Sequence, residues 1–291
     1  MPYLRLLMIS FFIFTACGNK NVFNDPIPAH KSITLDSKFV NETRVINIWT
    51  PPQYSDTASE FPVLYMPDGG INEDFPHIAN TLAKLIEENK IEPIILVGIK
   101  NTLRGRDLTG ASTVKEHEKY EIPMDDGAKS FRAFITEELI PKINATYRTS
   151  SKKGIIGESL AGLFVMETFF LKPETFDFYI AIDPSLWWNN NALVDEAETY
   201  FETLPKRETK LWFTASDAVD IYRYTEELKL KLETIEPANL LWKYSPEPNE
   251  HHNTIFRATK ENALIWCLGK SEYVLKLKQS LNGLSLKTTS A

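Results

Sequence analysis

Residues 154–162 read Gly-Ile-Ile-Gly-Glu-Ser-Leu-Ala-Gly: a short apolar run, then a serine among small residues, then the start of an apolar segment with helical spacing. In a nucleophile elbow, a strand turns sharply into a helix at a strained serine, so the residues two before and two or three after that serine must be small. Gly157, Ala161 and Gly162 meet this requirement. The stretch therefore predicts an elbow that exposes the hydroxyl of Ser159 above the edge of a sheet.

The stretch departs from the strict G-x-S-x-G pattern, because Ala161 occupies the last position. The alternative interpretation is a serine that caps an ordinary helix. The apolar run before Ser159 and the helical segment after it favour the elbow. An elbow would also direct the N–H of Leu160, at the N-terminus of the helix, toward a developing oxyanion.

Outside this stretch, short apolar runs alternate with segments of helical periodicity. The continuously apolar runs 94–97 and 178–182 indicate strands buried on both faces of a parallel sheet. The expected strands are 32–39, 44–50, 62–66, 94–99, 154–156, 178–182, 211–214 and 240–244. A few polar residues join the first two, which favours an antiparallel hairpin. The sequence predicts an α/β sandwich: a mostly parallel central sheet of about eight strands, with an antiparallel N-terminal hairpin and helices on both faces.

A serine needs a base to take its proton, and in elbow-bearing hydrolases the histidine follows the serine and the acid along the chain. Only His251 and His252 lie downstream of Ser159, in a loop after the last expected strand. The position of this loop fits the base of a catalytic triad. The residues alone leave the choice between the two histidines open.

The acid that orients the histidine should end the preceding strand. Asp217 is the first carboxylate after the expected strand 211–214, and Asp220 is the alternative. Either aspartate could instead cap the helix that follows. We predict Asp217 as the third member of the triad.

The composition of the 291 residues is that of an ordinary globular protein, with 43% hydrophobic and 24% charged residues. The net charge is -7 and no run of Lys and Arg forms a basic band. This argues against nucleic acid or an anionic membrane surface as the main partner. His30, His77 and His117 precede the elbow, and no cluster of His, Cys and Glu has metal-ligand spacing. We therefore expect no metal and no cofactor.

The N-terminus has the pattern of a signal peptide. Arg5 precedes an almost wholly apolar run over 6–16, which is short for a membrane span. Small residues then precede Cys17, which resembles the cleavage site of a bacterial lipoprotein. This resemblance implies a lipid on Cys17 and a place at the cell envelope; an ordinary secretory signal is the alternative. Cys267, in an apolar run, would then have no disulfide partner and should lie in the core.

Several further blocks carry a family resemblance. They are Val-Leu-Tyr-Met-Pro-Asp-Gly at 63–69, the stretch 97–109 with its Arg-Gly-Arg-Asp-Leu-Thr end, the helix and turn over 134–149, Asp-Pro-Ser-Leu-Trp-Trp at 183–188 and Asn-Glu-His-His-Asn-Thr-Ile at 249–255. Together with the elbow they resemble the esterase D-like esterases of the α/β-hydrolase superfamily. That family includes siderophore esterases, S-formylglutathione hydrolases and carbohydrate-ester esterases.

The resemblance implies roles for particular residues. It selects His252 over His251 as the base, and it places the second oxyanion N–H in the loop around Gly69. The side chains implied to line the substrate cleft are Arg104, Arg106, Trp187 and Trp188. Core packing remains the alternative for the two tryptophans, and ion pairing for the two arginines.

The expected function is that of a serine esterase, a carboxylic-ester hydrolase that works through a Ser-His-Asp triad and an acyl-enzyme. Siderophore or carbohydrate esters are the expected substrates. An acyltransferase with the same triad, or a non-catalytic ligand-binding surface lipoprotein, are the alternatives. The expected divisions of the chain are a signal peptide over 1–16, a tether over 17–30, an α/β-hydrolase domain over 31–269 and a C-terminal tail over 270–291.

Overall fold

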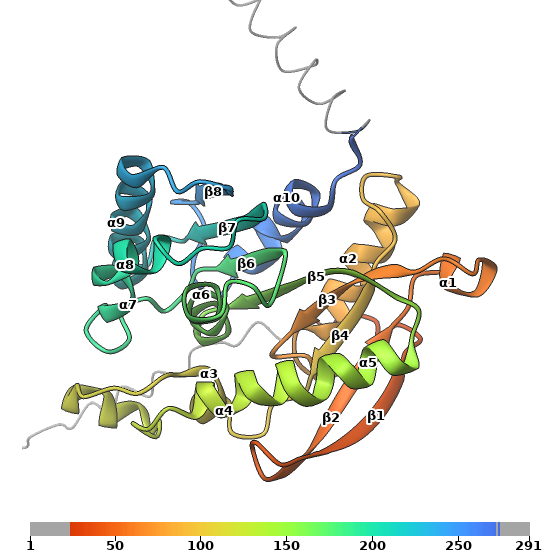
Figure 1. Ribbon diagram of the computed structural model, residues 1–291, viewed down its shortest axis with the longest axis horizontal. Helices are drawn as coiled ribbons and strands as arrows, with labels where there is room; N and C mark the ends of the chain where they lie inside the picture. Colours follow the sequence, from red (N-terminus) through yellow and green to blue (C-terminus); the bar gives the residue numbers. More distant parts are fainter. Residues whose placement is uncertain (1–23, 272, 274–291) are drawn as a thin grey trace, which may run out of the picture.

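A computed structural model describes residues 24–271 and 273 of the chain. The predicted signal peptide, the lipidation site Cys17 and almost all of the predicted tail over 270–291 lie outside these residues. Within them, an eight-stranded sheet runs through the centre of the molecule in the order β1-β2-β4-β3-β5-β6-β7-β8 (Figure 1).

The strands of this sheet are β1 (Lys31–Ser37), β2 (Glu42–Trp49), β3 (Phe61–Met66), β4 (Ile95–Ile99), β5 (Thr149–Glu158), β6 (Phe178–Ile182), β7 (Thr209–Ala215) and β8 (Leu240–Pro246). β1 pairs with β2 and β2 with β4 in antiparallel fashion, whereas all later neighbours are parallel. The predicted fold class and the N-terminal hairpin are therefore confirmed.

Helices cover both faces of the sheet (Figure 1). One face carries α2 (Phe75–Glu87) and α10 (Ile255–Leu268), whose apolar side chains form a single cluster with the sheet. The other face carries α4 (Gly127–Ala133), α5 (Ile140–Thr146), α6 (Leu160–Leu171), α8 (Ala197–Phe201) and α9 (Val219–Ile235). The shorter elements are α1 (Gln53–Asp56), α3 (Arg104–Leu108), α7 (Ala192–Asp195), a 3₁₀ turn over Lys115–Tyr120 and a π-helical turn over Phe134–Leu139.

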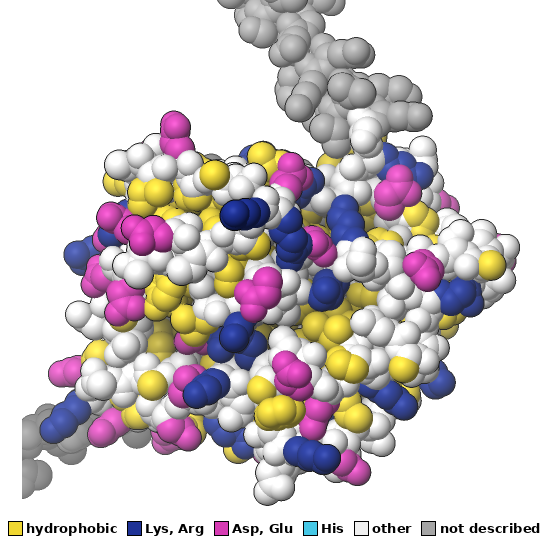
Figure 2. Space-filling model, viewed as in Figure 1, with side chains coloured by type: hydrophobic (Ala, Val, Ile, Leu, Met, Phe, Trp, Pro, Cys, Tyr) yellow, Lys and Arg dark blue, Asp and Glu magenta, His cyan; other side chains and the backbone are white. Residues whose placement is uncertain are grey.

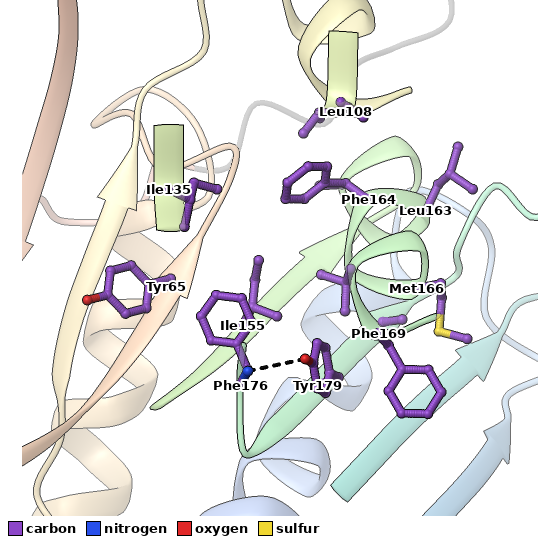
Figure 3. Close-up of a cluster of buried hydrophobic side chains, with 14 of the residues drawn as sticks. Tyr65, Leu108, Ile135, Ile155, Leu163, Phe164, Met166, Phe169, Phe176 and Tyr179 are labelled. Atoms are coloured by element: carbon purple, nitrogen blue, oxygen red, sulfur yellow. Dashed lines mark hydrogen bonds between the residues drawn. The ribbon is translucent and has the colours of Figure 1, made fainter. Parts of the chain in front are cut away.

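Helix α6 is apolar on almost every side, unlike a surface helix with one apolar stripe. It lies between the sheet and the helices α3 and α8, so most of its side chains are buried. Figure 3 shows Phe164 and Phe169 of this helix in the same buried cluster as Ile155 of β5 and Tyr179 of β6. The junction between β5 and α6 is thus held by tight packing.

Two further expectations concern the surface and the core. On the face shown in Figure 2, acidic and basic side chains are interspersed without a broad basic band. No helix in the described part of the chain is long and apolar enough to cross a membrane. Cys267 is buried in α10, as expected for a packing residue.

Candidate active site

A sharp turn joins β5 to α6 at Ser159. Its φ of 60° and ψ of -119° lie outside the regions that ordinary residues favour, and such a conformation costs about 1–3 kcal/mol. A side chain on Gly157 would come within 2.6 Å of the backbone of Ala161, so only glycine fits there. The Ser159 N–H donates to the carbonyl of Ile182 on the neighbouring strand at 3.0 Å, which holds the turn against the sheet. The predicted elbow has the expected geometry.

The loop between β8 and α10 brings His252 to this serine, 93 residues away in the sequence. Nε2 of His252 lies 3.1 Å from Oγ of Ser159. Its other ring nitrogen, Nδ1, lies 2.6 Å from Oδ2 of Asp183. With the proton on Nδ1 donated to this carboxylate, Nε2 is free to accept the hydroxyl proton of the serine.

The acid beside His252 is Asp183, which corrects the prediction of Asp217. Asp183 directly follows β6 and is completely buried. Asp217 follows β7 and instead pairs with His251, whose Nδ1 lies 2.6 Å from Oδ2 of Asp217 at an exposed position. The alternative acid, Asp220, is exposed in the first turn of α9.

The physical reason is the order of the strands. β6 is the direct neighbour of β5 in the sheet, whereas β7 lies one strand farther away. The carboxyl end of β6 therefore opens beside Ser159, and Asp183 turns there with a φ of 46°. Asp183 also satisfies the chain order serine, acid, histidine and ends a continuously apolar strand. The sequence therefore contained the signal for Asp183. The rule that the acid follows the strand directly before the histidine loop selects Asp217 instead.

Only one of the two predicted oxyanion donors is free for that role. Leu160 is the first residue of α6, where a backbone N–H has no acceptor within its own helix. The N–H of Gly69 already donates to the carbonyl of Ile99 at 2.9 Å. The N–H of Gly70 likewise donates to the carboxylate of Glu73 at 2.7 Å. The prediction of Gly69 is therefore wrong for this conformation of the loop.

The two arginines predicted to line the cleft have different surroundings. Arg104 stays next to the elbow, where its guanidinium forms two hydrogen bonds with Asp68 at 2.7 and 2.9 Å. It also lies 3.4 Å from the carbonyl of Glu158. Its side chain is 38% exposed, so it can still meet a ligand.

The guanidinium of Arg106 is bound by two carboxylates. It pairs with Asp107 at 2.7 Å and with Glu42 at 2.6 Å. Asp107 also pairs with Arg44, whose side chain is completely buried. This network ties α3 to β2, so the alternative of a structural ion pair holds for Arg106.

The two tryptophans are also divided between the surface and the core. Trp188 is buried, donates its indole N–H to the carbonyl of Gly110 at 2.9 Å and stacks on His117. Trp187 is only partly buried and contacts the ring of Tyr120 with 5.1 Å between centroids. Core packing therefore describes Trp188. Trp187 and Tyr120 offer aromatic surface, and Trp187 follows by two residues Ser185, whose hydroxyl lies 3.5 Å from Oγ of Ser159. Sequence reasoning missed Tyr120 because no pattern marks a residue in a short 3₁₀ turn.

Glu158, directly before the nucleophile, is an unusual acid. Burial raises its pKa from an ordinary value to about 9, so its side chain is neutral at neutral pH. Neighbouring carboxylates that act in the same direction are those of Asp74, Asp183 and Asp68. The positive charge of Arg104 opposes them.

This raised pKa predicts a pH-dependent stability. Between the ordinary pKa of 4.5 and about 9, the folded chain holds a proton on Glu158 that the unfolded chain has released. The free energy of unfolding should therefore fall as pH rises through this window, by on the order of several kcal/mol. Glu158→Gln should remove this loss of stability, because glutamine has no proton to release. Its melting temperature should exceed that of the unaltered chain at about pH 8.5 and differ little from it at about pH 5.

Glu60→Gln, at an exposed carboxylate, is the matched control and should change neither the melting temperature nor its slope with pH. Thermal unfolding followed by circular dichroism measures all three proteins. If the melting temperatures of the unaltered chain and of Glu158→Gln changed in parallel across this pH range, the assignment of a buried neutral acid would be contradicted.

Comparisons with known proteins point to one family. Residues 37–262 match the family model described as "Putative esterase". Over 209 residues the chain is 30% identical to the ferri-bacillibactin esterase BesA of Bacillus subtilis, which corresponds to 66% of this chain and 70% of that protein.

Solved structures agree with this relationship. An IroE-like serine hydrolase from Shewanella oneidensis superposes with a TM-score of 0.73 and 27% identity, covering 81% of this chain and 79% of the other. The BES protein from Bacillus cereus gives a TM-score of 0.73 at 23% identity, covering 84% and 98%, which supports the fold alone. The chain belongs to the esterase family that this model describes, and it is a serine ester hydrolase with the α/β-hydrolase fold.

Proposed function

We propose that this hydrolase works by two-step acyl transfer through Ser159, His252 and Asp183. The supporting observation is the continuous chain of contacts from Oγ of Ser159 to Nε2 of His252 at 3.1 Å, and from Nδ1 to Asp183 at 2.6 Å. His252 takes the hydroxyl proton as Ser159 attacks the ester carbonyl, and then passes that proton to the leaving alcohol. A water molecule next attacks the acyl-enzyme while His252 takes its proton, and His252 returns that proton to Oγ of Ser159 as the acid is released.

Two groups support the charges that form during these steps. The buried carboxylate of Asp183 holds His252 in the productive tautomer and stabilises the imidazolium. The N–H of Leu160 donates to the oxyanion that develops on the carbonyl oxygen. Its place at the N-terminus of α6 adds the favourable end of the helix dipole.

Siderophore-type esters are the substrate class that we propose for this site. BesA, a ferri-bacillibactin esterase, is the relative whose name supports it. The rings of Trp187 and Tyr120, which are inclined to each other by 41°, provide aromatic surface against which an aryl group of the ester can pack. Arg104, which remains partly exposed, can meet an oxygen-rich or anionic ligand.

An ester panel tests this proposal. Purified protein without residues 1–17 is offered catechol-siderophore lactones, acetylated or feruloylated glycans and short nitrophenyl esters, and kcat/KM is measured for each. We expect the siderophore lactones to be hydrolysed with the highest kcat/KM. A preference for glycan esters would redirect the substrate class, and a fluorophosphonate probe that fails to label Ser159 would refute the catalytic role of the site.

The lipid anchor stays a prediction of the sequence. We propose attachment of the chain to the bacterial cell envelope through Cys17 alone, on the basis of the lipoprotein-like residues around it. Labelling of cells with a clickable fatty acid checks this, with Cys17→Ser as the variant that should not be labelled. Equal labelling of both chains would exclude Cys17 as the attachment site.

A further inference from the structure

The loop after β7 makes direct contact with the acid of the triad. Ser216, the first residue after β7, is completely buried. Its N–H donates to Oδ1 of Asp183 at 2.6 Å, and its hydroxyl donates to Oδ2 at 2.8 Å. One residue thus binds both oxygens of the carboxylate.

The direction of the hydroxyl group is itself fixed. Oγ of Ser216 accepts a hydrogen bond from the N–H of Ala218 at 3.2 Å, so its proton is left to point at Asp183. Oδ2 of Asp183 then receives two donors, this hydroxyl and Nδ1 of His252 at 2.6 Å. A carboxylate held by donors on both oxygens cannot rotate freely about its last side-chain bond.

The same loop also holds the segment that carries the histidine. The N–H of Asp217 donates to the carbonyl of Glu250 at 2.9 Å, and the N–H of Glu247 donates to the carbonyl of Ala215 at 2.8 Å. The side chain of Asp217 adds its contact with His251. The residues after β7 therefore touch both the acid and the loop of the base.

We propose that Ser216 is a positioning residue of the hydrolytic reaction. Its hydroxyl fixes the plane of the Asp183 carboxylate, and this carboxylate in turn holds the imidazole of His252 in the orientation that can accept the proton of Ser159. This proposal deepens the proposed function and rests on it. The titratable groups near this carboxylate are His252 and, at longer range, the neutral side chain of Glu158.

A double-mutant cycle tests the proposal. We expect Ser216→Ala to lower kcat about tenfold, because one hydrogen bond to a charged group is lost, and to leave KM nearly unchanged. In the background of Asp183→Asn, the same change should cause almost no further loss, since Ser216 acts through the carboxylate. The full tenfold loss in that background, or no loss in the unaltered background, would overturn the proposal.

Two further variants separate positioning from folding. Ser216→Cys keeps a side chain of similar shape with a weaker donor, so its kcat should lie between that of the unaltered chain and that of Ser216→Ala. Thr209→Val removes a buried hydroxyl without a partner at the opposite end of β7, and should leave both kcat and KM unchanged. If the unaltered chain shows neither ester hydrolysis nor probe labelling at Ser159, the proposed function fails. If the unaltered chain is active and Ser216→Ala has the same kcat, only the role of Ser216 fails.

Discussion

Ser159→Ala should lower kcat by roughly 10³-fold or more while the protein stays folded. Alanine removes the nucleophilic oxygen, and neither His252 nor a helix N-terminus can replace it. The strained backbone at this position remains, because alanine adopts the same φ of 60° at a similar cost. Hydrolysis of a nitrophenyl ester measures the loss, and circular dichroism confirms the fold.

The control is Ser151→Ala, an exposed serine on the same strand β5. It should keep full activity and full labelling by a fluorophosphonate probe, whereas Ser159→Ala should not be labelled. Normal turnover by Ser159→Ala would remove the nucleophile from the proposed mechanism.

Asp183→Asn should lower kcat by about 10³- to 10⁴-fold, whereas Asp217→Asn should lower it by no more than about fivefold. An asparagine in place of Asp183 cannot stabilise the imidazolium, and its amide favours the wrong tautomer of His252. The side chain of Asp217 pairs with the exposed His251, and exposed pairs contribute little. The two variants change the same functional group, so they form a matched pair.

Initial rates at saturating substrate and melting temperatures of both variants complete this test. Asp183 is buried, and its replacement lowers stability as well, so activity is compared at a temperature where both variants are folded. The opposite ranking, with the greater loss for Asp217→Asn, would restore the acid that the sequence predicted and contradict the contacts of His252.

The elbow shows why some parts of the site could be predicted. Its chemistry depends on neighbours in the sequence, because strand β5, the small residues at 157 and 161 and the first turn of α6 are contiguous. The strain at Ser159 is local, and local constraints leave a signature in the residue types. The position of the histidines after the last strand is also a matter of chain order, which the sequence shows directly.

The acid and the cleft show where such reasoning stops. Asp183 and Asp217 both follow apolar strands, and the choice between them depends on which strand lies beside β5. Arg104 and Arg106 are two residues apart, yet one faces Asp68 near the elbow and the other faces Glu42 on β2. Charge and spacing alone do not distinguish these environments.

The succession of strands along the chain, the elbow at Ser159 and the loop of His252 could be predicted from the residues alone, since each rests on periodicity or on neighbours in the chain. The pairing of Asp183 with His252, the bonded N–H of Gly69 and the contact of Ser216 with the buried carboxylate became visible only in the folded chain. These contacts join segments that are distant in the sequence. Hydrogen bonds depend on distances and angles that exist only after the strands have paired.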